Sequence, residues 1–267
     1  MVKVMASAND KYWQRREKAE RDYIKGLLAD DEAFNKTIEA HYKKAIDDIS
    51  KEITAQYANY ANAGKYTMKE AIKQVSAEDI KQYQSQAKAI VKAAQKRSPK
   101  AFSDEINRHL KLYNATMRIN RLELLKSRAG LELVNAGIAI NSDLAAKLTT
   151  DYQNEIRRQA GILGEDIPTD LNNSKTLFKK VIAQTQSANF SQRVWGNVDA
   201  LKAQLDTTLV NMSLQGTNPR DAARQLRTQI GASYTHATFA TERIARTESA
   251  RLQTQAQLDS FKAYGYD

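Results

Sequence analysis

The stretch that decides the fold is residues 34–60, FNKTIEAHYKKAIDDISKEITAQYANY. Its large apolar residues recur in steps of four, four, four, three, four, four and three: Phe34, Ile38, Tyr42, Ile46, Ile49, Ile53, Tyr57 and Tyr60. This spacing places them on one face of an α-helix roughly 40 Å long, at 1.5 Å per residue. A helix of that length needs a second long helix along its apolar face, so the stretch predicts an extended helical protein.

Residues 1–33 are predicted to supply that neighbouring helix. Their apolar positions lie on a charged background: Trp13, Tyr23, Ile24, Leu27 and Leu28. We interpret Asp30 and Asp31 as the turn of an antiparallel hairpin between the two helices. Further along, Thr67 with Glu70 three residues later has the spacing of a capping box, which predicts a shorter helix.

The composition favours helix over every other fold class. Only 10 Gly and 3 Pro occur among 267 residues, which leaves few of the turn signals that an all-β or doubly wound fold requires. There is no cysteine, which excludes disulfides, thiolate metal sites and cysteine nucleophiles. No stretch approaches the roughly 20 consecutive apolar residues of a membrane span, and the first residues lack the apolar run of a signal peptide. We therefore expect an all-α protein without a membrane segment or a secretion signal.

The middle of the chain predicts two further helices and a linker. One helix begins at Ser98 and Pro99, a cap and a first helical position, and extends to about Gly137. Residues 141–143, Asn-Ser-Asp, then cap another helix. Turn residues dominate residues 164–173. We place a domain boundary there, between an elongated long-helix hairpin or bundle before it and a compact helical domain after it.

The two predicted domains are residues 1–163 and residues 174–267, joined by the linker of residues 164–173. Four helices with marked caps are expected in the second domain, beginning at Ser174, Phe190, Pro219 and about Tyr234. Gly216 and Gly231 are interpreted as the stops between the last three helices.

The formal net charge of +10 is concentrated in one segment. Residues 88–128 hold eleven basic and three acidic residues, an excess of +8, and three of these lysines follow the i, i+4 spacing of a stripe along a helix. Such a stripe is either a solvated face or a surface for DNA or an acidic partner. The candidates for that contact are Lys88, Lys92, Lys96, Arg97, Lys100, Arg108, Lys111, Arg118 and Arg121.

No arrangement of residues predicts catalysis or a metal site. His41, His109 and His236 lie far apart without ligand spacing, so each is expected to be structural. The glycines form neither a GxGxxG nor a Walker loop, and no GxSxG nucleophile elbow occurs. We expect a protein that is not an enzyme and that needs neither cofactor nor metal.

The two tryptophans have different expected roles. Trp13 follows Tyr12 and precedes Arg15 and Arg16. An aromatic pair beside two arginines either anchors a helix in the fold or docks on a partner. Trp195 lies among regularly spaced apolar residues and is predicted to be part of the core.

The last helix contains residues 242–251, ERIARTESAR. Glu242 and Arg246 are four residues apart, the spacing of a local ion pair worth roughly 0.3 kcal/mol. We also expect Glu248 and Arg246 to be partly buried and to tie this helix to the one that begins at Pro219. The arginines available there are Arg220, Arg224 and Arg227.

This helix resembles the signature helix of the phage Mu F-like head morphogenesis family, which are minor capsid proteins. The resemblance rests on an Arg-Thr-Glu triplet, a polar stretch after it and an aromatic-Gly ending at Tyr264, and it covers roughly residues 174–265. The opening around Tyr12 and Trp13 is similar to the N-terminal part of minor head proteins of phages that infect Gram-positive bacteria. The motif residues carried over, with a structural role, are Arg246, Thr247, Glu248 and Gly265.

The resemblance implies a minor capsid protein of a tailed bacteriophage. Its place would be the portal vertex inside the head, after assembly in the host cytoplasm, with a role in procapsid assembly and in DNA packaging or ejection. The implied partners are the portal protein, capsid or scaffold proteins, and packaged double-stranded DNA bound without sequence specificity. Tyr12, Trp13, Arg15 and Arg16 are the candidates for docking on the portal.

Two alternatives stay open at the level of sequence. Many members of the family continue into a Cys-x-x-Cys segment, whereas this sequence ends at Asp267, so we expect either a shortened member or the N-terminal portion of a longer protein. The competing function is a free cytoplasmic helical protein that binds nucleic acid non-specifically through residues 88–128.

Overall fold

The protein is all-α, as predicted. The computed structural model describes residues 2–62, 75, 77–97, 106–111, 121–184, 188–214 and 219–266. The labelled helices are α1 (Val2–Asn62), α3 (Ala77–Arg97), α5 (Arg121–Leu163), α6 (Ser174–Val181), α7 (Phe190–Leu214) and α8 (Pro219–Ala263). The helices expected to start at Thr67 and at Ser98 begin outside the described residues.

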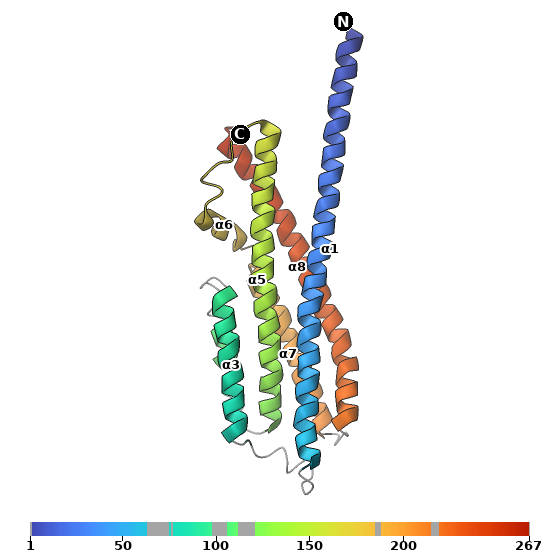
Figure 1. Ribbon diagram of the computed structural model, residues 1–267, viewed down its shortest axis with the longest axis vertical. Helices are drawn as coiled ribbons and strands as arrows, with labels where there is room; N and C mark the ends of the chain where they lie inside the picture. Colours follow the sequence, from blue (N-terminus) through green and yellow to red (C-terminus); the bar gives the residue numbers. More distant parts are fainter. Residues whose placement is uncertain are drawn as a thin grey trace.

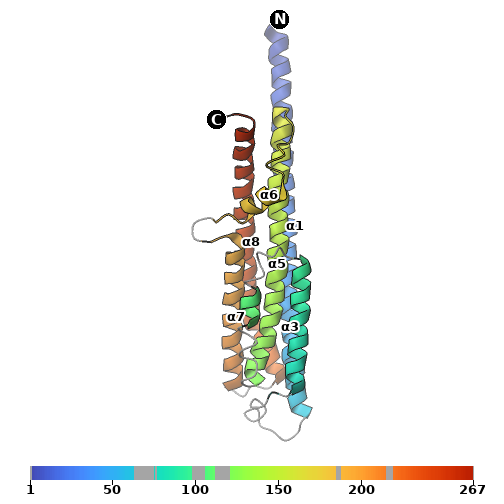
Figure 2. The same ribbon diagram turned by 90° about the vertical axis from the view of Figure 1, so that its left-hand side faces the viewer.

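Four long helices form an elongated bundle. Helices α1, α5, α7 and α8 lie along the long axis, and the colours in Figure 1 show that α1 and α7 run in one direction and α5 and α8 in the other. Helix α3 packs along α5, and the short α6 contacts the same helix. The N-terminal part of α1 projects beyond the rest of the bundle in both views (Figures 1 and 2). The expected elongated architecture is therefore confirmed.

The apolar face predicted from residues 34–60 is the face that α1 buries. Ile38, Tyr42, Ile49 and Ile53 are at most 1% exposed, and α1 contacts α5 and α8. The Tyr42 hydroxyl lies 3.1 Å from the hydroxyl of Thr241 in α8, so even the polar end of this ring has a partner. The period of four and three residues thus identified the core residues of this half of α1.

The hairpin predicted at Asp30 and Asp31 is wrong, because α1 continues through both residues without a break. Neither glycine nor proline interrupts the helix there. Asp31 instead forms an ion pair with Lys147 of α5, at 3.0 Å. The carboxylate that was interpreted as a turn signal is a contact between two packed helices.

The break predicted between Gly137 and residues 141–143 is also wrong, because α5 is continuous from Arg121 to Leu163. Asn141 is 1% exposed in the middle of this helix. Gly137 is a point of close approach: a Cβ atom added to it would lie 2.9 Å from Cζ3 of Trp195 and 3.1 Å from Cγ2 of Val198, both in α7. The glycine is there because the rings and methyl groups of α7 need the space, which is a packing reason and not a stop signal.

The third correction concerns the predicted stop at Gly231, since α8 runs unbroken from Pro219 to Ala263. Nothing lies within 4 Å of a Cβ atom added at Gly231. The real ends of α5 and α8 use Gly164 and Gly265, whose φ angles of 73° and 76° are left-handed. At Gly265 the Tyr266 amide donates to the Phe261 carbonyl at 2.9 Å and the Gly265 amide to Lys262 at 3.2 Å, the hydrogen bonds of a Schellman motif.

Residues 164–173 form the connection between α5 and α6, and helices on both sides of it share one hydrophobic core. That core extends from Ile38 in α1 to Ala256 in α8 and includes Trp195, which is 2% exposed as predicted. Asn173 caps α6 by accepting a hydrogen bond from the Thr176 amide at 2.9 Å. The predicted boundary therefore lies within one bundle and not between two separate cores.

Gly137 and Gly231 provide a matched pair of stability tests. Gly137→Ala is expected to lower the free energy of unfolding by about 1–3 kcal/mol, because the added methyl group collides with the Trp195 ring. Gly231→Ala places the same methyl group in open space in a helix interior, so it should raise the free energy of unfolding by up to about 1 kcal/mol. Urea denaturation of both variants measures the difference; equal shifts in the same direction would contradict this account of the contact between α5 and α7.

Candidate functional site

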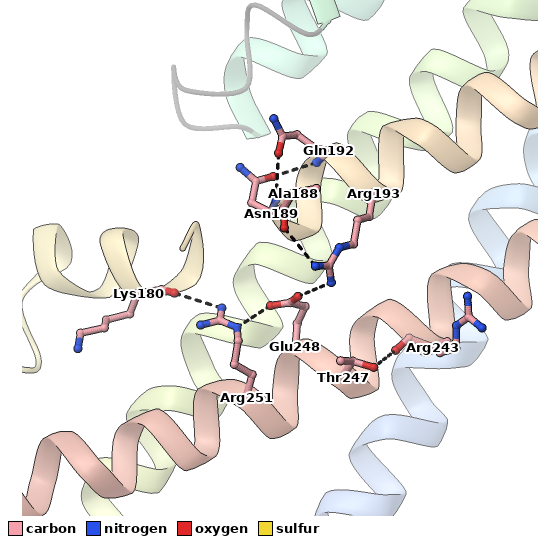
Figure 3. A network of polar contacts seen from close by, with 9 residues as sticks. All are labelled: Lys180, Ala188, Asn189, Gln192, Arg193, Arg243, Thr247, Glu248 and Arg251. Atoms are coloured by element: carbon pink, nitrogen blue, oxygen red, sulfur yellow. Dashed lines mark hydrogen bonds and ion pairs between the residues drawn. The ribbon is translucent and has the colours of Figure 1, made fainter. Parts of the chain in front are cut away.

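The centre of the Arg-Thr-Glu motif is a buried carboxylate. Glu248 lies in α8 and is 1% exposed. Its Oε1 accepts a hydrogen bond from Nη1 of Arg193 in α7 at 2.9 Å, and its Oε2 accepts one from Nε of Arg251 at 2.7 Å (Figure 3). A carboxylate removed from water needs such partners for both oxygens, because an uncompensated buried charge is strongly destabilising.

The two arginines around Glu248 extend the contact to the ends of two more elements. Arg193 donates from Nη2 to the Ala188 carbonyl at 3.1 Å, and Arg251 donates from Nη2 to the Lys180 carbonyl of α6 at 3.2 Å (Figure 3). Asn189 and Gln192 cap the start of α7 reciprocally. The backbone N–H of Asn189 donates to the side-chain oxygen of Gln192 at 3.0 Å, and the backbone N–H of Gln192 donates to the side-chain oxygen of Asn189 at 2.9 Å. Glu248 therefore joins α8 to the end of α6 and the start of α7.

The structure confirms that Glu248 is buried and corrects its predicted partners. Arg246 is exposed and pairs with Glu242 on its own helix at 3.6 Å, the local pair expected from their spacing. Thr247 donates to the Arg243 carbonyl at 2.8 Å, also within α8. The predicted tie to a separate helix beginning at Pro219 is wrong, because Pro219 is the first residue of α8 itself. The partner that sequence reasoning missed, Arg193, lies 55 residues before Glu248.

A second carboxylate of α8 strengthens the same region. Asp259 accepts hydrogen bonds from the Tyr152 hydroxyl of α5 at 2.5 Å, from Nζ of Lys180 at 2.8 Å and from Gln255 at 2.9 Å. Burial favours the neutral acid, but these three donors outweigh burial and hold the pKa of Asp259 below its ordinary value. Lys180 thus joins α6 to α8 twice, through its ammonium group and through its carbonyl.

The aromatic-Gly ending holds the connection of residues 164–173. Tyr264 directly precedes Gly265, whose backbone is left-handed. The Tyr264 hydroxyl donates a hydrogen bond to the Asp166 carbonyl at 3.1 Å. Because Gly265 closes α8 at that point, the ring of Tyr264 stays beside the loop. Glu248 and the Tyr264-Gly265 ending are therefore joints of the fold, whereas Arg246 and Thr247, among the described residues, make side-chain contacts only within α8.

Glu248→Ala should lower the free energy of unfolding by about 3 kcal/mol, because Arg193 and Arg251 lose the charge that they share. Arg246→Ala is the matched control in the same triplet: Arg246 is exposed and, among the described residues, pairs only with Glu242 of its own helix, so a change of less than about 0.5 kcal/mol is expected. Chemical denaturation of the two variants gives both values. A loss at Arg246 as large as that at Glu248 would argue against the buried joint.

The lowered pKa of Asp259 predicts a specific acid dependence. Ionised Asp259 contributes its full stabilisation when the pH is above 3.8, the pKa of this group in the unfolded chain. The contribution is lost as the pH falls through the lower pKa of the folded state. Asp259→Asn should therefore be less stable than the unchanged protein at pH 7, and the difference in the free energy of unfolding should shrink as the pH falls below about 4. Thermal or urea unfolding between neutral and acid pH tests this; a difference that does not vary with pH would contradict it.

The second predicted site lies on the projecting part of α1. Trp13 is 61% exposed and Tyr12 50% exposed, with their ring centroids 5.3 Å apart in an edge-on contact. Arg15 donates to the Lys11 carbonyl at 3.3 Å and Arg16 pairs with Glu20 at 3.7 Å, so both arginines lie along their own helix. Trp13 therefore does not anchor the core described for this chain, and docking of this residue on a partner stays a prediction.

The basic segment divides into structural and exposed parts. Arg108 pairs with Asp199 of α7 at 3.2 Å, and the neighbouring His109 is buried and lies 2.6 Å from the same carboxylate, as expected of a structural histidine. Arg128 is also buried and pairs with Glu52 of α1 at 2.6 Å. The side chains of four other candidates lie outside the described residues: Arg97, Lys100, Arg118 and Arg121.

The remaining candidates stay at the surface. Lys88, Lys92 and Lys96 are exposed along α3, and Lys111 is exposed on the segment of residues 106–111. Lys88, Lys92 and Lys111 line one groove between these two elements, with a volume of about 780 Å³. Sequence reasoning predicted the stripe but not the groove, because the pairing of residues 106–111 with α3 is a tertiary contact that leaves no local signal.

In the part of the chain that the structure describes, no cluster of three or more His, Cys, Asp or Glu side chains is arranged to hold a metal ion. No described helix is both long and apolar enough to span a membrane. Comparison of the chain with family models, with curated proteins and with solved structures found no match. The resemblance to the Mu F-like family therefore stays an expectation that rests on the sequence motif.

Proposed function

We propose that this chain is a minor capsid, or head morphogenesis, protein of a tailed bacteriophage. It would bind at the portal vertex inside the head and support procapsid assembly and DNA packaging or ejection. The proposal rests on the sequence resemblance around Glu248 and Tyr264 and on the role of these residues as joints of the bundle. The proposed role depends on surfaces that bind other molecules.

The observation that carries the proposal is an exposed apolar row on the N-terminal half of α1, which begins on its projecting end and continues beside α5. Trp13, Ile24 and Leu28 are 61%, 53% and 64% exposed. Ile24 follows Trp13 by 11 residues, about three turns, and Leu28 follows Ile24 by four residues, about one more turn. All three side chains therefore lie on one side of the helix. An exposed apolar row on a projecting helix is suited to insertion in a groove of a partner, with a tryptophan as the anchor. In this proposal the partner is the portal protein.

The exposed lysines of α3 support a second contact inside the head. Lys88, Lys92 and Lys96 are all exposed, so their charges are available to packaged DNA or to an acidic capsid or scaffold surface. Contacts to DNA phosphates would carry no sequence information and would weaken steeply as the salt concentration rises.

The same lysines favour the alternative function, a free cytoplasmic protein that binds nucleic acid non-specifically. The two functions make different demands on α1. A portal-bound protein depends on Trp13 as an anchor for its partner, whereas the alternative depends on the lysines of α3. Quantitative mass spectrometry of purified virions separates them: a few copies per head, counted against the portal and major capsid proteins, supports the proposal, and absence from particles at every stage of assembly favours the alternative.

Trp13→Ala is expected to weaken binding to the portal protein of the same phage by about 30-fold, the effect of removing an anchor worth roughly 2 kcal/mol. Phe239→Ala is the matched control, because Phe239 of α8 is 62% exposed but lies away from the projecting end. Co-purification and titration of the two purified proteins measure the effect. Unchanged portal binding by Trp13→Ala would refute the assignment of this surface.

A further inference from the structure

Among the described residues, no acidic side chain lines the groove between α3 and residues 106–111. Its rim carries Lys88 and Lys92 from α3 and Lys111 from the opposite side, all exposed. None of these three lysines forms an ion pair with another described residue, whereas Lys44, on the neighbouring α1, pairs with Asp48. Within the part of the chain that the structure describes, the groove therefore presents three cations that face the same space without an acidic partner.

The floor of the groove is apolar. Ala87 and Val91 of α3 and Leu110 of the opposite segment line it, and each is half-buried. Tyr83 also lines it and is 1% exposed, yet its hydroxyl has no hydrogen-bond partner in the described structure. Burial raises the pKa of this hydroxyl, so it remains a hydrogen-bond donor at neutral pH. Because the hydroxyl itself is buried, Tyr83 contributes to the floor without offering a polar contact to the groove.

We propose that this groove binds an acidic, amphipathic peptide segment of a partner protein. Carboxylates of the segment would pair with Lys88, Lys92 and Lys111, and its apolar side chains would lie on Val91 and Leu110. The lining on α3 extends from Tyr83 to Gln95, which is roughly 18 Å along the helix axis and matches about three turns of a bound helix. This inference holds whether or not the chain is a minor capsid protein.

Nucleic acid fits the groove less well. Its phosphates would suit the lysines, but they have nothing to place on an apolar floor. Single strands bind mainly by stacking their bases on exposed aromatic rings, and the ring that lines this groove, Tyr83, is buried beneath its neighbours. A duplex would need a convex or open basic surface and gains nothing from a groove of about 780 Å³. The combination of cationic rim and apolar floor is the pattern of peptide recognition.

The test is fluorescence anisotropy of a labelled amphipathic peptide built of Glu, Ala and Leu, titrated with the full chain. Saturable binding is expected, and the double variant Lys88→Glu with Lys92→Glu should weaken it by at least about tenfold. The matched control is Lys175→Glu with Lys179→Glu on α6: the pair has the same i, i+4 spacing, the same change in charge and the same exposure. It should change the affinity by less than about twofold. Thermal melting confirms that both variants remain folded.

Two further probes distinguish the occupants. A peptide with every Leu replaced by Ser should bind at least about tenfold more weakly, because it cannot cover Val91 and Leu110. A labelled DNA duplex should not displace the first peptide at physiological salt. The proposal is overturned if the Glu-Ala-Leu peptide does not bind, if the α6 control weakens binding as much as the α3 variant, or if the duplex competes for the groove and the Leu residues make no difference.

Discussion

The burial of α5 is the constraint on which the rest of this structure depends. Every other labelled helix packs against it, so most of its length is removed from water. The charges that α5 nevertheless carries must be paired inside the bundle, because an isolated buried charge is too costly to keep. Glu155, which is fully buried, accepts hydrogen bonds from Tyr23 of α1 at 2.7 Å and from Gln257 of α8 at 2.9 Å. Burial of the apolar residues holds the helices together, and these polar pairs favour one axial register of each helix along α5.

Sequence reasoning predicted the parts of the fold that are written in local periodicity. The core face of α1 followed from the spacing of residues 34–60, and the starts of α6 and α7 followed from their caps. The continuity of the helices could not be predicted from local sequence. Asp31, Asn141 and Gly231 are residue types typical of helix ends, but each lies within a helix. Asp31 pairs across to α5 and Asn141 is buried in it, so tertiary contacts override the local preference at both positions. A single sequence gives no view of those contacts.

The candidate sites were predictable to a similar extent. The sequence singled out Glu248 and the lysines of α3, and the structure places the first in a buried joint and the second at the surface. The partners were not predictable, because Arg193 and Lys180 come from elements far away in the sequence. For the same reason the groove between α3 and residues 106–111 was missed. Residue type and spacing identify which side chains carry charge. Only the fold determines whether such a charge is paired within the chain or exposed to another molecule.

The continuity of α1 has a mechanical consequence. A single helix of 61 residues spans roughly 90 Å, and Glu20 and Tyr23 hold it against α5 through their contacts with Arg158 and Glu155. With no hinge at Asp30 and Asp31, a load applied to its free end is passed directly into the core and cannot be absorbed by a turn. The projecting end of α1 and helix α3 lie far apart along the long axis (Figure 1). If partners bind at the end of α1 and beside α3, the continuous helix between them would keep them apart along the long axis.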